Sequence, residues 1–210
     1  MIELELKYKL TNIPEATVKL EKVKTKAQTD IYYDTQDYDL IRKGNFLRVR
    51  NGEKLEFKVD LDDASHLYCK ETVFKIKEIK QNINEINKVF SAIGIRQSKQ
   101  VEDFDDFVEK NDLIIIAPIK KVRTEYRLAK NITIAVDEVD DLGLFLEAEI
   151  MVDHDDLSAE NAVEIKEELV NELLKAKVIS SNDEMVNIGY VELYLLKHNK
   201  NVYELGKFKI

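Results

Sequence analysis

The chain has 210 residues and a formal net charge of −9 at pH 7, with 44% hydrophobic and 35% charged residues. This length allows one large domain or two small ones, with a sizeable buried core. The negative charge argues against sequence-independent binding of nucleic acid and against an anionic membrane surface, because both require a positive protein surface. The single cysteine, Cys69, cannot form an internal disulfide, which favours a reducing compartment.

The sequence suggests neither a membrane segment nor a division into domains. The N-terminus lacks an apolar signal core, and the longest apolar run, at 113–117, is too short to cross a bilayer. Only six Gly and two Pro occur, and no Gly/Ser/Pro-rich linker or repeat is visible. We therefore expect a cytoplasmic protein with one domain over residues 1–210, binding neither nucleic acid nor membrane.

Residues 2–10 alternate between apolar and charged side chains, which predicts a strand with two distinct faces. The charged residues, which share one face, are Glu3, Glu5, Lys7 and Lys9. A half-buried strand with this face in water is the ordinary interpretation. The alternative is that the charged face lines a polar interior, and the later strands bear on this choice.

The next elements are predicted from turn residues and local periodicity. Pro14 predicts a helix over 14–23, because proline suits a first helical turn. Asn51-Gly52, between two alternating runs, is typical of a type I′ hairpin. In chain order we expect a strand at 28–35, a helical turn at 37–44 closed by Gly44, and hairpin strands at 46–50 and 53–59.

The second half of the chain mixes helices and strands. In chain order we expect a strand at 65–76, helices at 83–94 and 101–108, strands at 118–128, 132–137 and 143–150, a helix capped by Ser158, and a helix at 183–197. A turn at Asp140-Asp141 joins the last two strands. The mixture of mostly antiparallel strands with interspersed helices predicts an α+β protein.

Charges recur on one face of several predicted strands. These faces carry Arg48 and Arg50; Lys54, Glu56 and Lys58; Lys121, Arg123, Glu125 and Arg127; and Glu147 and Glu149, while Asp137 ends its own strand. The acids lie on the first and last strands, and the bases predominate between them. If the sheet closes into a barrel, the first and last strands become neighbours and their carboxylates converge.

Five carboxylates would then meet: Glu3, Glu5, Asp137, Glu147 and Glu149. Like charges this close repel one another and raise each other's pKa. A hard divalent cation such as Mg²⁺ or Mn²⁺ removes that cost, because it takes carboxylate oxygens as ligands. Basic residues inside a barrel also need hydration or a partner, and a phosphate chain satisfies both Arg and Lys.

The order of the motifs resembles that of the CYTH family, the triphosphate tunnel metalloenzymes. Glu3-x-Glu5-x-Lys7 is similar to the ExExK signature of that family. The matching motifs that follow are Y-Y-D-T at 32–35, L-R-V-R at 47–50, Lys58 of E-F-K, K-V-R at 121–123, Asp137, and L-G-x-F-x-E-x-E at 142–149. Alternating charged strands are common, so the ordered set carries the resemblance rather than ExExK alone.

The resemblance implies an eight-stranded antiparallel β-barrel that forms an open tunnel, with C-terminal helices at about 158–197 packing on it. It implies that one or two Mg²⁺ or Mn²⁺ ions are held by the metal-binding and catalytic residues Glu3, Glu5, Asp137, Glu147 and Glu149. It implies that a small-molecule triphosphate is bound by Lys7, Arg48, Arg50, Lys58, Lys121 and Arg123. A monomer or a homodimer is compatible with the resemblance.

Such a tunnel supports two reactions: water as the nucleophile gives hydrolysis, and a ribose 3′-hydroxyl gives cyclisation with release of pyrophosphate. Q-T-D-I-Y-Y-D-T at 28–35 is similar to class IV adenylyl cyclases, but F-K-V-D-L-D-D at 57–63 replaces their Y-K-G-P-like segment. The C-terminal Y-L-L-K-H-N-K-N-V-Y-E-L is closer to thiamine triphosphatase-like members. We expect a metal-dependent triphosphatase acting on inorganic, thiamine or nucleoside triphosphate; an adenylyl cyclase and a triphosphate-binding module without turnover are the alternatives.

Overall fold

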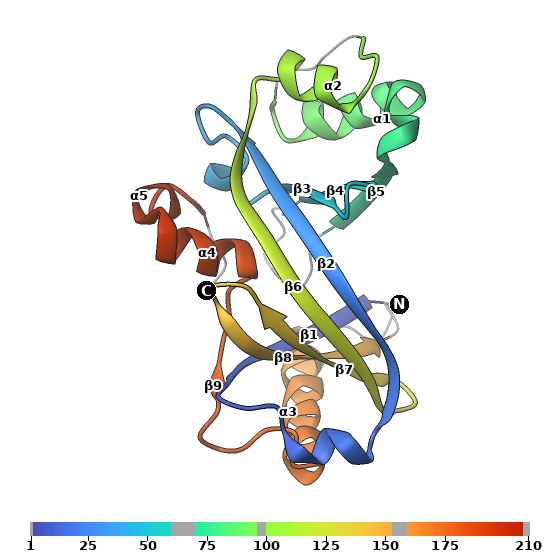
Figure 1. Cartoon of the computed structure of the whole chain (residues 1–210), viewed down its shortest axis with the longest axis vertical. Helices are drawn as coiled ribbons and strands as arrows, with labels where there is room; N and C mark the ends of the chain where they lie inside the picture. Colours follow the sequence, from blue (N-terminus) through green and yellow to red (C-terminus); the bar gives the residue numbers. More distant parts are fainter. Residues whose placement is uncertain (1, 60–69, 96–99, 153–158, 208–210) are drawn as a thin grey trace. The chain divides into compact units, whose positions relative to one another are not determined.

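The computed structural model describes residues 2–59, 70–95, 100–152 and 159–207, which form an α+β protein (Figure 1). The strands are β1 (Ile2–Leu10), β2 (Glu21–Thr35), β3 (Phe46–Arg50), β4 (Lys54–Val59), β5 (Lys70–Lys75), β6 (Leu113–Ala129), β7 (Ile132–Val139), β8 (Gly143–Val152) and β9 (Glu184–Met185). They form one sheet in the order β5-β4-β3-β2-β6-β7-β8-β1-β9. Antiparallel pairing joins β1 to β8 and β9, β3 to β2 and β4, β4 to β5, and β7 to β6 and β8.

The helices lie between and after the strands. They are α1 (Ile79–Ala92), α2 (Phe104–Lys110), α3 (Ala159–Lys175), α4 (Tyr190–His198) and α5 (Lys200–Tyr203), with short 3₁₀ helices η1 (Glu15–Lys19), η2 (Ile41–Lys43) and η3 (Ile76–Glu78). None of the described helices is both long and apolar enough to cross a membrane.

The predicted α+β class is confirmed, and the eight longer strands match the predicted number, with the two-residue β9 in addition. Over the described part of the chain, β5 and β9 are the two ends of the strand order. Closure of the sheet into a barrel therefore stays a prediction.

The chain divides into two compact units. Unit 1 comprises Met1–Gln28 and Lys120–Asn187, and unit 2 comprises Thr29–Ile119 and Ile188–Ile210. β2 and β6 each contribute residues to both units. Each unit has a hydrophobic core of its own, and the charged residues of interest divide between the two units.

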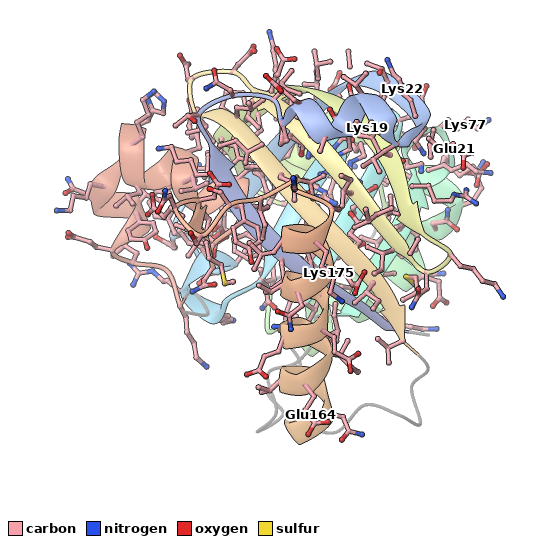
Figure 2. The ribbon with its side chains drawn as sticks, turned by 90° about the horizontal axis from the view of Figure 1, so that it is seen from below. Lys19, Glu21, Lys22, Lys77, Glu164 and Lys175 are labelled. Carbon is pink, nitrogen blue, oxygen red and sulfur yellow. The ribbon has the colours of Figure 1, made fainter. Side chains whose placement is uncertain are left out.

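The core of unit 1 lies between one face of its strands and α3. Leu6 and Tyr8 of β1 belong to a buried cluster with Leu146 of β8 and with Leu169 and Leu173 of α3. Figure 2 shows α3 along its length, with Glu164 and Lys175 near its ends. The apolar face predicted for residues 2–10 is therefore buried against a helix, which leaves the charged face on the other side of the strand.

The core of unit 2 lies between β3, β4 and the helices α1 and α2. Leu47 and Phe57 pack with Phe90 of α1 and Phe107 of α2 in one buried cluster. The rings of Phe57 and Phe90 meet edge to face, with centroids 5.5 Å apart. Since side chains alternate along a strand, burial of the odd-numbered positions places Arg48 and Arg50 on the opposite face.

The predicted hairpin at 46–59 is confirmed. Asn51 and Gly52 both have positive φ, 54° and 69°, as a type I′ turn requires. Asn51 also fixes the neighbouring strand, because its Oδ1 accepts a hydrogen bond from the Thr29 amide at 2.8 Å and its amide donates to the Thr29 carbonyl at 2.8 Å. The turn therefore sets the register in which Arg48 lies opposite Glu56.

Several sequence predictions are wrong in their boundaries, including the strands predicted at 28–35 and 118–128, which begin at Glu21 and Leu113. The helix predicted at 14–23 is only the 3₁₀ helix η1, and β2 already begins at Glu21. The segment is extended because it pairs with β6 in the sheet, and Lys24 and Lys26 lie on one face of it, at 2.9 and 3.2 Å from Glu125 of β6.

The helix predicted at 183–197 begins only at Tyr190. The preceding Glu184 and Met185 form β9, which pairs with β1 through Tyr8 and Lys9. The predicted cap Ser158 lies outside the described residues, and so does the first part of the strand predicted at 65–76.

Candidate functional site

One face of the unit 1 sheet carries a cluster of interleaved acids and bases, here called the unit 1 cluster. Its members are Glu5, Lys7, Lys121, Arg123, Asp137, Glu147 and Glu149. The strand register makes opposite charges face each other, with Lys7 opposite Glu147 and Arg123 opposite Asp137. Side chains directly opposite on antiparallel strands share a face, so the sheet itself assembles the cluster.

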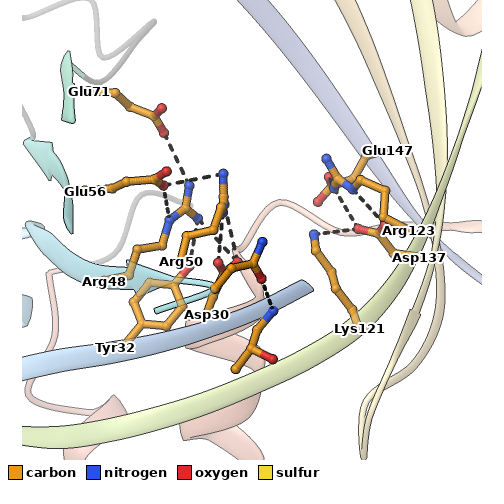
Figure 3. A network of polar contacts seen from close by, with 12 residues as sticks. Asp30, Tyr32, Arg48, Arg50, Glu56, Glu71, Lys121, Arg123, Asp137 and Glu147 are labelled. Carbon is orange, nitrogen blue, oxygen red and sulfur yellow. Dashed lines mark hydrogen bonds and ion pairs between the residues drawn. The ribbon is translucent and has the colours of Figure 1, made fainter. Parts of the chain in front are cut away.

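Asp137 lies at the buried centre of this cluster and is fully inaccessible to solvent. Its Oδ2 accepts from Lys121 Nζ at 2.7 Å and from Arg123 Nη2 at 2.6 Å, and its Oδ1 accepts from Arg123 Nε at 2.8 Å (Figure 3). A buried carboxylate with three charge-assisted hydrogen bonds fixes its donors in place. Asp137 therefore orients both Arg123 and Lys121.

Glu147 joins β1 to the same network. Its Oε1 lies 3.3 Å from Lys7 Nζ, and its Oε2 accepts from Arg123 (Figure 3). Burial alone would raise the pKa of Glu147, but the charges of Lys7, Arg123 and Lys121 hold that pKa well below its ordinary value. Glu147 is therefore a stable anion despite being 5% exposed.

The two buried lysines respond differently to the cluster. Burial lowers the pKa of Lys7, but Glu147 and Glu5 outweigh that effect and raise it above the ordinary value. Burial also lowers the pKa of Lys121, and there the attraction of Glu147 and Asp137 does not compensate for burial and the repulsion of Arg123. The two lysines of the cluster thus have pKa values shifted in opposite directions.

The chemistry of the carboxylates fits a divalent cation. Glu5 and Glu149 lie directly opposite each other in the β1–β8 register, with side chains 37% and 27% exposed. Like charges placed directly opposite destabilise a sheet, and Mg²⁺ or Mn²⁺ takes ligands of this kind. Within the described residues, no group of three or more His, Cys, Asp or Glu side chains is arranged so that it could hold a metal ion.

Glu3 was predicted to belong to this set. Its backbone lies opposite Met151 in the β1–β8 register, but its side chain lies outside the part that the structure describes. A role for Glu3 therefore stays a prediction.

Unit 2 carries a second cluster, here called the unit 2 cluster, on the charged face of β2, β3 and β4. Arg48 Nε donates to Glu56 Oε2 at 2.7 Å, and Arg50 Nε donates to Asp30 Oδ1 at 2.9 Å (Figure 3). Arg48 also donates from Nη1 to the hydroxyl of Tyr32 at 3.1 Å. The two predicted arginines thus lie in one network of neighbouring strands.

Lys58, the remaining predicted phosphate ligand, is exposed on β4. It lies opposite Phe46 of β3 and Glu71 of β5. The same Glu71 lies 3.9 Å from Arg48 Nη2, so Lys58 borders the unit 2 cluster. That both clusters line one shared tunnel stays a prediction.

Comparison with known proteins identifies the family to which the chain belongs. The family model for the CYTH domain matches residues 1–178. The chain belongs to the CYTH domain family. The resemblance drawn from the ordered motifs is therefore confirmed.

The relatives of this CYTH chain differ in what their names say of activity. A Methanocaldococcus jannaschii protein named "Putative adenylate cyclase" is 28% identical over 198 residues, covering 92% of this chain and 98% of the relative. A solved structure from Pyrococcus horikoshii OT3 has a TM-score of 0.61 at 22% identity, covering 94% of this chain and all of the other. A Hippeastrum structure, described as a putative adenylyl cyclase with a dominant triphosphatase activity, has a TM-score of 0.59 at 17% identity, covering 93% of this chain and 96% of the other.

Asp30, Tyr32 and Glu56 were not predicted as site residues from the sequence of this CYTH chain. They accept hydrogen bonds from Arg48 and Arg50. A signal for Glu56 was present, because the hairpin turn places it directly opposite Arg48. No comparable local signal existed for Asp30, since its place opposite Arg50 depends on how β2 pairs with β3.

Proposed function

We propose that the protein is a divalent-metal-dependent hydrolase of a triphosphate compound. The observation that carries the proposal is the unit 1 cluster, in which the buried Lys121 and the half-buried Arg123 lie beside carboxylates on one sheet face. Arg offers a planar fork and Lys a point charge to phosphate oxygens, while the carboxylates suit a divalent cation. A metal-bound phosphate chain is a ligand that suits both kinds of group.

The charge of the cluster supports the need for a cation. Four described carboxylates, those of Glu5, Asp137, Glu147 and Glu149, outnumber the three cations. An anionic triphosphate approaching this surface alone would meet net negative charge, which disfavours binding. Neutralisation by a divalent ion removes this obstacle.

The roles of the residues follow from their contacts. Arg123, Lys121 and Lys7 bind anionic oxygens, and Asp137 holds the first two of them in position. The predicted carboxylates, of which Glu5 and Glu149 are the more exposed, would hold Mg²⁺ or Mn²⁺. When bound, such an ion neutralises charge that develops on the phosphate oxygens. A carboxylate that the ion leaves unused accepts a proton from the attacking water.

An adenylyl cyclase is the second candidate. It is supported by the name of the Methanocaldococcus jannaschii relative and by the cyclase-like stretch at 28–35. The triphosphatase is favoured because the Y-K-G-P-like segment of those cyclases is replaced by F-K-V-D-L-D-D. A module that binds triphosphate without turnover is the third candidate.

Product analysis separates the three candidates. The protein is incubated in turn with inorganic triphosphate, thiamine triphosphate and ATP, with Mg²⁺ or Mn²⁺ and with EDTA as the control. We expect orthophosphate from at least one substrate, only with the metal. Cyclic AMP and pyrophosphate from ATP would establish the cyclase instead, and calorimetric binding without any product would leave a binding module.

A further inference from the structure

The arginines of the unit 2 cluster are held by acids that are buried more deeply than the arginines themselves. The side chains of Arg48 and Arg50 are 19% and 27% exposed, whereas Asp30 and Glu56 are 4% and 6% exposed. The acids therefore lie beneath the guanidinium groups rather than over them. A ligand that approaches from solvent meets the arginines first.

The contacts fix the plane of each guanidinium. Asp30 accepts from Arg50 Nε at 2.9 Å and from Arg50 Nη2 at 3.3 Å, which is a bidentate pair. Glu56 Oε2 accepts from Arg48 Nε at 2.7 Å and lies 3.4 Å from Arg50 Nη1, so one carboxylate connects both arginines. Because two contacts define an orientation, neither guanidinium rotates freely.

Tyr32 adds a third, uncharged contact. Its hydroxyl accepts from Arg48 Nη1, and Arg48 Cζ lies 6.0 Å from the centre of its ring. The ring is itself buried and packs edge to face on Phe46. Tyr32 is therefore a rigid support for Arg48.

Arg48 also has a more distant and more exposed partner, Glu71. Arg48 Nη2 lies 3.9 Å from Glu71, whose side chain is 50% exposed. An exposed ion pair at this distance contributes little and exchanges readily with other anions. Glu71 thus provides a matched control: a carboxylate near Arg48 that does not fix its orientation.

We propose that Asp30, Glu56 and Tyr32 are positioning residues, which hold Arg48 and Arg50 in the orientation that binds phosphate oxygens. The inference rests on the proposed function and on the expectation, drawn from the family resemblance, that these two arginines bind the triphosphate. Groups that are already ordered lose less conformational entropy when a ligand binds. Asp30, Glu56 and Tyr32, here called the supports, increase the affinity for triphosphate in this way, although two of them are negatively charged.

Charge alone predicts that removing Asp30 or Glu56 strengthens the binding of triphosphate, whereas the inference predicts that it weakens binding. The direction of the change in affinity therefore tests the inference. Removing a carboxylate beside two arginines makes the site more positive, so a purely electrostatic effect would tighten the binding of an anion. Loss of positioning would weaken binding despite the more favourable charge.

The experiment measures the Kd of diimidotriphosphate, an analogue of inorganic triphosphate whose P–N–P bridges resist hydrolysis, by calorimetry in the presence of Mg²⁺. We expect Asp30→Asn and Glu56→Gln to weaken binding about tenfold, and Tyr32→Phe to weaken it several-fold. The control Glu71→Gln should bind equally well or more tightly. Asp30→Glu, which keeps the carboxylate, should recover part of the affinity that Asp30→Asn loses.

Thermal unfolding of each variant identifies those that fold. If Asp30→Asn or Glu56→Gln does not fold, Tyr32→Phe decides, since it changes neither charge nor ring volume. Unchanged affinity in Tyr32→Phe, or tighter binding in the two acid variants, would overturn the inference.

Arg48→Ala and Arg50→Ala separate this result from failure of the proposed function. If both bind triphosphate as the wild type does, the arginines are not ligands, and the inference fails with their assigned role. If both bind weakly while the variants of the supports bind normally, the arginines keep that role and only the positioning inference fails.

Discussion

Arg123 is the residue on which the unit 1 cluster depends. Its guanidinium contacts Asp137, Glu147 and, at 3.6 Å, Glu149. One planar cation thereby holds carboxylates from two strands. These carboxylates differ in solvent exposure. Neutralising each of them should therefore change the free energy of unfolding by a different amount.

Glu147→Gln should destabilise the protein far more than Glu149→Gln. Glu147 is 5% exposed, and its loss leaves the buried Lys7 and the half-buried Arg123 with less compensation for their charges. Breaking a buried pair costs about 3–5 kcal/mol, whereas a partly exposed pair contributes about 0–1 kcal/mol. Urea unfolding measures the free energies; equal losses in the two variants would contradict the difference in burial.

The low pKa of Glu147 predicts how stability depends on pH. A carboxyl whose folded pKa lies below its ordinary value of 4.5 stabilises the fold above that pH, and the contribution is lost as the pH falls through the folded pKa. The wild type should therefore lose free energy of unfolding below about pH 4.5. Glu147→Gln should show a smaller loss over this range, since the variant has no proton to take up there; parallel pH profiles would argue against the assignment.

At the scale of elements, the strands present two faces because their sequence alternates, and α3 covers the apolar face of unit 1. Adjacent leucines on α3 provide a matched pair, because Leu173 is fully buried and Leu174 is 39% exposed. Leu173→Ala should cost about 2–5 kcal/mol through the lost contacts and the cavity, and Leu174→Ala less than about 1 kcal/mol. Thermal and urea unfolding check this difference, and similar losses would mean that α3 does not form the core of unit 1.

For the whole molecule, the net charge of −9 raises the question of whether divalent ions act specifically or by general screening. If Glu149 holds an ion, millimolar Mn²⁺ should raise the Tm of the wild type, because a ligand that binds only the folded state stabilises it. Glu149→Gln should lose much of this rise. Glu164→Gln, which removes the same charge from an exposed position on α3, should keep it; an equal response from both variants would indicate general screening.

The sequence by itself determined the features that depend on neighbouring residues. Alternation along residues 2–10 and 46–59 defined which side chains share a face, and Asn51-Gly52 defined the hairpin that places Glu56 opposite Arg48. The ordered motifs indicated the CYTH family, which the match over residues 1–178 confirmed. Each of these signals is local or is carried by the order of short segments.

Only the tertiary structure decided which distant charges meet. The extension of β2 back to Glu21, and the place of Asp30 beneath Arg50, depend on pairing with strands that lie elsewhere in the chain. The roles of Asp137 and Glu147 as the buried partners of Lys121, Arg123 and Lys7 were also not visible locally. The physical reason is that a side chain's face is set by its own strand, whereas its partner is set by the register between strands, which depends on residues far apart in sequence.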